Sequence, residues 1–118
     1  VPLLAVACET DHIAAWDQSY RGVQQMQGIE RRFILAESGH VAGIINPPQR
    51  NKYGYYTNPD LQADPVDWQS NAEHHAGSWW PAWQDWLLLH CGNTVKARKP
   101  KAAKGLKLID APGTYVQK

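Results

Sequence analysis

The first 45 residues alternate between apolar runs and short polar breaks, and this pattern predicts regular structure. Val1–Cys8 (VPLLAVAC) is almost entirely apolar, which is typical of a strand covered on both faces of a parallel sheet. After the polar turn Glu9–Asp11, apolar side chains recur at helical spacing at Ile13, Trp16, Tyr20 and Val23. This spacing predicts an amphipathic helix, with Thr10 or Asp11 as its cap and Gly28 at its end.

A second apolar run, Arg32–Ala36 (RFILA), predicts another strand, and the loop Glu37–His40 follows it before Val41–Ile45 turns apolar again. A strand, a helix and a second strand in this order form a βαβ crossover, so we predict an α/β fold with neighbouring parallel strands. Two strands do not make a stable, doubly covered sheet. We therefore expect partner strands upstream of Val1, and a chain that is incomplete as a fold on its own.

The second half of the chain has weaker periodicity. Residues 49–77 are rich in Tyr, Asn, Pro and Asp, and we expect an irregular excursion over the surface. A helix is predicted near Pro81, with Ser78 as a possible cap and Gly92 at its end. Three tryptophans, Trp79, Trp83 and Trp86, would share one of its faces. We expect residues 1–95 to form part of one domain and residues 96–118 a mobile tail, with residues 111–116 docking again at its end.

Composition narrows the class of protein. The chain has 118 residues, enough for one domain, with 43% hydrophobic and 19% charged residues. It contains no apolar run long enough to span a membrane, and we expect no secretory leader. Cys8 and Cys91 lie far apart and in apolar surroundings, so we expect reduced, buried thiols and a cytoplasmic protein, with a single disulfide as the alternative. The first residue is Val1, inside an apolar run, so we expect the chain to be truncated upstream.

Charge is distributed unevenly along the chain. Six of the 12 basic residues, and none of the 11 acidic ones, lie between Lys96 and Lys107. Such a segment could attract nucleic acid or another anionic surface, although a solvated tail is the commoner case. Because no aromatic residues are interleaved to stack on bases, we expect no nucleic-acid partner.

Asp11 and His40 are the residues best placed to carry chemistry. Each follows the C-terminal end of a predicted strand, where catalytic groups collect in open parallel sheets. Loops from adjacent parallel strands lie side by side, so the carboxylate could orient the imidazole and stabilise its protonated form. Triads of the α/β-hydrolase fold run nucleophile, acid, histidine along the chain, with the acid and the histidine on late loops. Alternatively, Asp11 only caps the helix and His40 is a loop histidine.

Several longer segments resemble class I polyhydroxyalkanoate synthases. They are Glu9–Trp16 (ETDHIAAW), Ser38–Pro48 (SGHVAGIINPP), Asn51–Asn58 (NKYGYYTN), Gly77–Trp83 (GSWWPAW) and Ala111–Val116 (APGTYV). The likeness runs in order from nearly one end of the chain to the other. It implies the C-terminal part of an α/β-hydrolase fold, with the last strands and helices of a mostly parallel sheet.

The resemblance also implies an activity. It implies a bacterial acyltransferase that polymerises (R)-3-hydroxyacyl groups from coenzyme A thioesters into a growing polyester chain and releases coenzyme A. The family's acid and histidine carry over to Asp11 and His40. Its nucleophile is a cysteine in a Gly-x-Cys-x-Gly motif, which this chain lacks, because Cys8 and Cys91 have no such flanking glycines. The family further implies a homodimer attached to polyester granules in the cytoplasm.

Other candidates carry weaker signals. His12 could touch substrate, but a histidine in a first helical turn is more often a surface or packing residue. His74 and His75 are adjacent, so their side chains diverge, and no further ligand stands at metal-binding spacing. We therefore expect no metal ion and no cofactor.

Two other functions remain open from the residues. One is an esterase or depolymerase with a serine nucleophile upstream, which a Gly-x-Ser-x-Gly motif would reveal. The other is a non-catalytic interaction module built from the tryptophan-rich helix and the basic tail. The interaction-module hypothesis does not explain why the sequences around Asp11 and His40 match those of a catalytic site.

Overall fold

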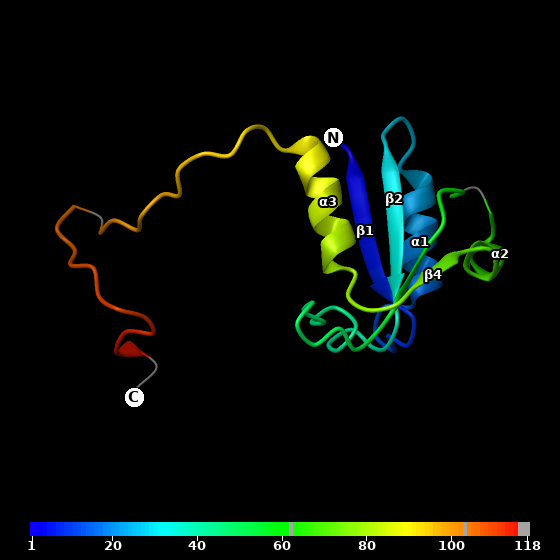
Figure 1. Ribbon diagram of the computed structural model, residues 1–118, viewed down its shortest axis with the longest axis horizontal. Coiled ribbons are helices and arrows are strands. Elements are labelled where there is room, and N and C mark those ends of the chain that lie inside the picture. Colours follow the sequence, from blue (N-terminus) through cyan, green and yellow to red (C-terminus); the bar gives the residue numbers. More distant parts are fainter. Residues whose placement is uncertain (62, 103, 116–118) are drawn as a thin grey trace.

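The computed structural model describes residues 1–61, 63–102 and 104–115, and it has a mixed sheet with helices on both faces (Figure 1). The strands are β1 (Leu3–Cys8), β2 (Arg31–Ala36), β3 (Tyr55–Thr57) and β4 (Glu73–His75), in that spatial order. The helices are α1 (Trp16–Gln25), α2 (Pro65–Ser70) and α3 (Trp80–His90). The predicted α/β class is confirmed. Among the described residues, no helix combines the length and the apolar character needed to cross a membrane.

The β1–α1–β2 crossover is the part that the sequence pattern predicts best. β1 and β2 pair in parallel in one unbroken register, from Leu3 opposite Arg31 to Cys8 opposite Ala36. The expected parallel pair is therefore present. β1 stands at the end of the sheet order, so among the described strands it pairs on one edge only.

The predicted start of the first helix was wrong by about one turn. Ile13, expected on the buried face, is 75% exposed, and the helix begins only at Trp16. The reason is local: the Asp11 carboxylate accepts hydrogen bonds from the backbone N–H groups of Ile13 and Ala14, which holds these residues in a separate turn. Ala15, the residue that caps α1, has no side-chain hydrogen bond to the helix.

One face of the sheet packs against α1 and α2 through aromatic rings. Tyr20 and Trp68 are fully buried, and their ring centroids lie 5.3 Å apart. Phe33 on β2 meets both rings edge-on, at 5.2 Å from each. Such edge-to-face contacts add to the stabilisation from burying the ring surfaces. This cluster fixes α1 against the strand that leads into the histidine loop.

The opposite face packs against the first turn of α3. Trp79 is 8% exposed and lies with Cys8, Ile34 and Ala36 in a second buried cluster. Because side chains alternate along a strand, Ile34 and Ala36 face this cluster while Phe33 faces the other. Both faces of β1 and β2 are therefore covered, as their apolar sequences predict.

The excursion predicted over residues 49–77 is more regular than expected. It contains β3, α2 and β4, and it extends the sheet by two antiparallel strands. Each of these strands has three residues, which is too short to show an alternating pattern in the sequence. Asp64 caps α2 by accepting a hydrogen bond from Val66, and Pro65 follows it in the first turn.

The third helix forms as predicted, but its outer part is exposed. Ser78 accepts a hydrogen bond from the Trp80 backbone N–H, 3.1 Å away, and Pro81 lies in the first turn. Trp83 is 41% exposed, so the three tryptophans do not all face the core. The helix ends at His90, which leaves Cys91 exposed, and the expectation that Cys91 is buried was wrong.

The segment after α3 runs away from the sheet (Figure 1), and its described residues form no α-helix or β-strand. We expected residues 111–116 to dock again, but in the described residues 111–115 they do not. Tyr115 is 87% exposed, and the sixth residue of that segment, Val116, lies outside the described residues. The ring of Tyr115 therefore makes little contact with this chain.

Gly43 and Gly22 offer a matched test of the packing around the histidine loop. A Cβ atom at Gly43 would lie 2.6 Å from the Glu37 carbonyl oxygen and 2.7 Å from the Cys8 sulfur, whereas one at Gly22 in α1 would meet nothing within 4 Å. Gly43→Ala should lower the free energy of unfolding of the full-length protein by about 1–3 kcal/mol because of overpacking.

Gly22→Ala should raise the same quantity by about 0.5–1 kcal/mol, because alanine is the better helix former. Urea denaturation of both variants and of the unchanged protein measures the two effects. Equal stability of the two variants would contradict the close packing described at Gly43.

Candidate active site

The loops after β1 and β2 are joined by backbone hydrogen bonds, which continue the parallel pairing beyond the strands. The Glu9 N–H donates to the Ala36 carbonyl at 2.8 Å, and the Thr10 N–H donates to the Ser38 carbonyl at 3.1 Å. These bonds hold Asp11 and His40 on neighbouring loops at the same edge of the sheet. This is the edge at which ligands bind in open α/β sheets.

Asp11 and His40 are in contact, as their positions predict. Nδ1 of His40 lies 3.2 Å from Oδ1 of Asp11, and their side chains are 39% and 11% exposed. A carboxylate only accepts hydrogen bonds, so Nδ1 carries the proton that it donates to Asp11. In neutral imidazole this tautomer leaves Nε2 as the basic nitrogen. The contact is established, and its catalytic role remains a prediction.

The Asp11 carboxylate is held by three donors on one oxygen. Oδ1 accepts from the Ile13 N–H at 2.8 Å, from the Ala14 N–H at 3.2 Å and from His40. The Ile13 hydrogen bond contributes most to lowering the pKa of Asp11 below its usual value, with help from Ala14 and His40 and against the opposing effect of burial. Asp11 is therefore ionised at neutral pH and fixed in orientation.

The turn that carries His40 is held in place by two tryptophan rings. The Trp79 indole N–H donates to the Gly43 carbonyl, and the Trp80 indole N–H donates to the Ile44 carbonyl, each at 2.9 Å. These hydrogen bonds anchor the backbone that follows His40. From the sequence we expected Trp79 on a shared helix face, and this hydrogen-bonding role was not predicted. The sequence holds no signal that pairs an indole with a carbonyl 36 residues earlier.

The residue two positions before His40 has an unusual backbone. Ser38 adopts φ 72°, in the left-handed region that residues other than glycine seldom occupy. Its carbonyl accepts the Thr10 hydrogen bond that joins the two loops. Such strain persists where the surrounding structure over-determines it, and it is common next to functional groups.

Cys8 is close to this site but unsuited to be its nucleophile. It is buried, as predicted, and burial followed by the charge of Asp11 raises the pKa of its thiol. A raised pKa disfavours the reactive thiolate. Cys91 lies beyond α3, on the part of the chain that leaves the sheet. That neither cysteine is the nucleophile stays a prediction.

His74 and His75 point to different partners, as expected for adjacent residues in a strand. Nε2 of His74 lies 2.9 Å from Oε1 of Glu37, whose other oxygen accepts the Gly54 N–H. Nε2 of His75 lies 2.7 Å from the Thr57 hydroxyl. Both histidines therefore take part in contacts that hold β4 and the loop before β3 in place.

His12 is nearer to the site than its sequence signal suggested. Its ring centroid lies 5.3 Å from that of His40, and the residue is exposed. One ligand atom each from Asp11, His12 and His40 lies within 4.8 Å of the others. No spacing rule pointed to this cluster, because it depends on how the turn after Asp11 folds.

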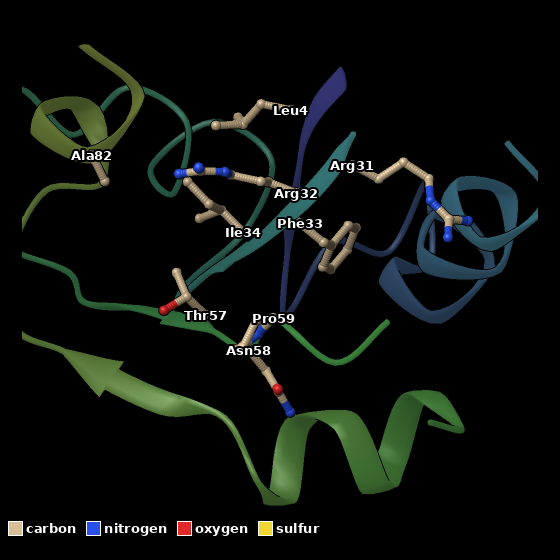
Figure 2. A pocket seen from close by; sticks show the side chains of 9 residues that line it. All are labelled: Leu4, Arg31, Arg32, Phe33, Ile34, Thr57, Asn58, Pro59 and Ala82. Carbon is tan, nitrogen blue, oxygen red and sulfur yellow. The ribbon is translucent and has the colours of Figure 1, made fainter. Parts of the chain in front are cut away.

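The described surface includes a hollow near the turn after His40 and another on the sheet. One, of about 270 Å³, adjoins the turn after His40 and is lined by Val41, Ala42, Ile45, Asn46, Arg50, Lys52 and Tyr53. The other, of about 360 Å³, lies where β2 begins and includes Leu4, Arg32 and Thr57 (Figure 2). None of the residues that line this second hollow is Asp11, His12 or His40. The hollow near the turn after His40 includes two basic residues, Arg50 and Lys52, in its lining.

Comparison with known proteins gives one consistent result. The chain is 43% identical over 113 residues to poly(3-hydroxyalkanoate) polymerase 2 of Ectopseudomonas oleovorans, covering 94% of this chain. It is 37% identical over 118 residues to poly(3-hydroxyalkanoate) polymerase subunit PhaC of Cupriavidus necator, covering 99%, and 36% identical over 116 residues to the PhaC subunit of Rhizobium etli, covering 98%. The chain spans about a fifth of the length of these relatives (20%, 20% and 18%). No family model matches it.

The lowered pKa of Asp11 predicts how its stabilising effect depends on pH. Because folding lowers this pKa, the contribution to stability is complete above the ordinary aspartate value of about 3.9 and is lost as the pH falls through the lower folded value. Asp11→Asn should therefore unfold at a lower urea concentration than the unchanged protein at pH 7, and the difference should narrow below about pH 4. Urea midpoints measured at pH 7 and at values well below pH 4 test this. A difference that widens on acidification would contradict the assigned direction.

Proposed function

Because this chain corresponds to a segment of the poly(3-hydroxyalkanoate) polymerases, we propose that it supplies the acid and the histidine of such an enzyme's active site. The observation that carries the proposal is the contact between His40 and Asp11 at the ends of adjacent parallel strands. The whole enzyme would transfer (R)-3-hydroxyacyl groups from coenzyme A thioesters to a growing polyester. A cysteine upstream of Val1 would be the nucleophile.

In the proposed acylation, His40 acts as the base. With Nδ1 directed at Asp11, Nε2 is free to take the proton from the cysteine thiol. The thiolate then attacks the thioester carbonyl, the bond between carbonyl carbon and coenzyme A sulfur breaks, and the departing thiolate takes up a proton. The acyl group is left on the cysteine, and no other reactant is needed.

Elongation requires a second proton transfer. The 3-hydroxyl group at which the chain is extended must lose its proton as it attacks an acyl thioester. Asp11 could assist that hydroxyl directly, or it could orient His40 for the task. The three hydrogen bonds that converge on Oδ1 support the orienting role, because they fix the carboxylate toward the imidazole.

The proposal extends to the fold and the surroundings of the enzyme. The sheet would be the last part of an α/β-hydrolase fold, with further strands pairing on the edge of β1 that has no partner among the described strands. Residues 1–95 would belong to the catalytic domain, and residues 96–118 would form its basic tail. The hollow with Arg50 and Lys52 offers positive charge for phosphate groups of coenzyme A. Dimerisation and attachment to cytoplasmic polyester granules rest on the resemblance alone.

The two alternative functions fare differently. A serine hydrolase would use the same acid and histidine, so the residue in the upstream nucleophile motif separates it from the polymerase. The interaction module loses support, because Trp79 and Trp80 are engaged in hydrogen bonds inside the protein.

The 118-residue chain alone should have no polymerase or esterase activity. It carries no suitable nucleophile, and apolar side chains such as Leu88 and Leu89 are 63% and 69% exposed. Its free strand edge and exposed apolar surface also predict poor stability. Release of coenzyme A from a 3-hydroxyacyl thioester by the purified chain would contradict the first part, and a sharp, cooperative melt of the monomer would contradict the second.

In the full-length enzyme, His40→Ala and Asp11→Asn should have different effects. Loss of His40 should slow both acylation and polymer formation, by about 10² to 10⁴ for a positioned base. Some acylation should persist, because cysteine is partly ionised without a base. If Asp11 orients His40, Asp11→Asn slows both steps. If it serves the hydroxyl group, one acyl group still loads and elongation fails.

The measurement compares single-turnover release of coenzyme A with polymer formation for each variant. Asp17→Asn is the matched control, because Asp17 is in the first turn of α1 and its carboxylate bonds only to neighbouring Gln18 among the hydrogen bonds described. Near-normal polymerisation by either His40→Ala or Asp11→Asn would mean that the residues are wrongly assigned.

A further inference from the structure

Three side chains at the edge of the sheet form a possible set of metal ligands, of which the proposed polymerase reaction uses two, Asp11 and His40, but not His12. They are Asp11, His12 and His40, with one ligand atom of each within 4.8 Å of the others. We propose that these residues bind a divalent transition-metal ion such as Zn²⁺, and that the bound ion reversibly blocks proton transfer by His40. The binding site stands on geometry alone, whereas the block rests on the proposed function.

The separation of the two closest donors suits one ion. Zn²⁺ binds imidazole nitrogen and carboxylate oxygen at about 2.0–2.2 Å, so two ligands of a tetrahedral site lie about 3.3–3.5 Å apart. Oδ1 of Asp11 and Nδ1 of His40 are 3.2 Å apart. An ion could therefore replace the proton that these atoms share with little movement of either loop.

The third donor is able to complete the site. His12 is exposed and lies before α1, in the turn that Asp11 holds by its backbone hydrogen bonds. Its ring centroid is already 5.3 Å from that of His40, and the two rings are inclined at 54°. Because no described hydrogen bond holds the His12 side chain, its rotation costs little beyond rotamer entropy.

The Asp11 carboxylate has a second oxygen atom, Oδ2, that can contribute to metal binding. All the hydrogen bonds described for the Asp11 side chain end on Oδ1, so within the described part of the chain Oδ2 accepts none. With Oδ1 as the ligand that faces Nδ1 of His40, Oδ2 can also approach the ion, while the Ile13 and Ala14 N–H groups continue to orient the carboxylate. Hydrogen bonds that orient a ligand in this way typically strengthen metal binding.

The donor set also selects the kind of ion. Two imidazoles and one carboxylate suit Zn²⁺, Cu²⁺ and Ni²⁺, whereas Ca²⁺ and Mg²⁺ prefer sites made of oxygen atoms. An ion on the His40 imidazole occupies a nitrogen lone pair and removes the proton shared with Asp11. In that state His40 no longer has the tautomer that its role as base requires.

The direct test is binding of Zn²⁺ and Co²⁺ to the full-length protein, by titration calorimetry and by the visible absorption of bound Co²⁺. Losing a group that merely orients a ligand already weakens metal binding by about 10–100-fold, so His12→Gln, which removes a ligand, should weaken binding at least tenfold. His74→Gln is the matched control, because His74 lies on β4 beside Glu37, and it should leave the affinity unchanged. Equal affinities for His12→Gln and the unchanged protein, or no bound ion, would overturn the site.

The second test concerns the block. Release of coenzyme A is followed with and without Zn²⁺, each variant is compared with its own metal-free rate, and a chelator is then added. We expect inhibition that the chelator reverses and that needs at least tenfold more Zn²⁺ in His12→Gln. Metal binding without inhibition would overturn the block and leave the site standing. If the full-length protein binds the metal ion but releases no coenzyme A in its absence, the result would instead count against the proposed polymerase function.

Discussion

The parallel pairing of β1 and β2 is the constraint on which the site depends. Its hydrogen bonds run past the ends of both strands, so the loops that follow are joined backbone to backbone before any side chain takes part. Asp11 and His40, 29 residues apart in the sequence, meet because of this join. A shift of one strand by one residue would turn that strand's side chains to the wrong face and separate the pair.

The two covered faces of the sheet contribute in different ways. On the α1 side, Tyr20, Phe33 and Trp68 form an apolar cluster that fixes the crossover helix. On the α3 side, the indole groups of Trp79 and Trp80 also donate hydrogen bonds to the turn after His40. A residue type usually associated with the core thus positions a loop. The strand sequences account for the apolar cluster, whereas only the tertiary structure accounts for the hydrogen bonds from the indole groups.

The sequence predicted the parts that rest on long, continuous patterns. Apolar runs located β1 and β2, and topology then placed Asp11 beside His40. The predicted start of the first helix was wrong because a local polar group competed with the apolar pattern. The Asp11 carboxylate accepts hydrogen bonds from the Ile13 and Ala14 N–H groups and holds them in a separate turn. Prediction also failed for β3 and β4, since strands of three residues have too few positions for a period to show. The approach of His12 to His40 depends on that same turn, so no sequence spacing could reveal it.

The edge of β1 that has no partner among the described strands affects how the polypeptide associates with other molecules. The strand Leu3–Cys8 carries no charged residue and no proline, the features by which natural edge strands avoid pairing with one another. Wherever nothing covers that edge, its unused N–H and C=O groups would serve as a template for a strand of another molecule. β1, which positions the Asp11 carboxylate, is thus also the strand from which edge-to-edge aggregation would start. Covering its edge would therefore be a condition for solubility as well as for catalysis.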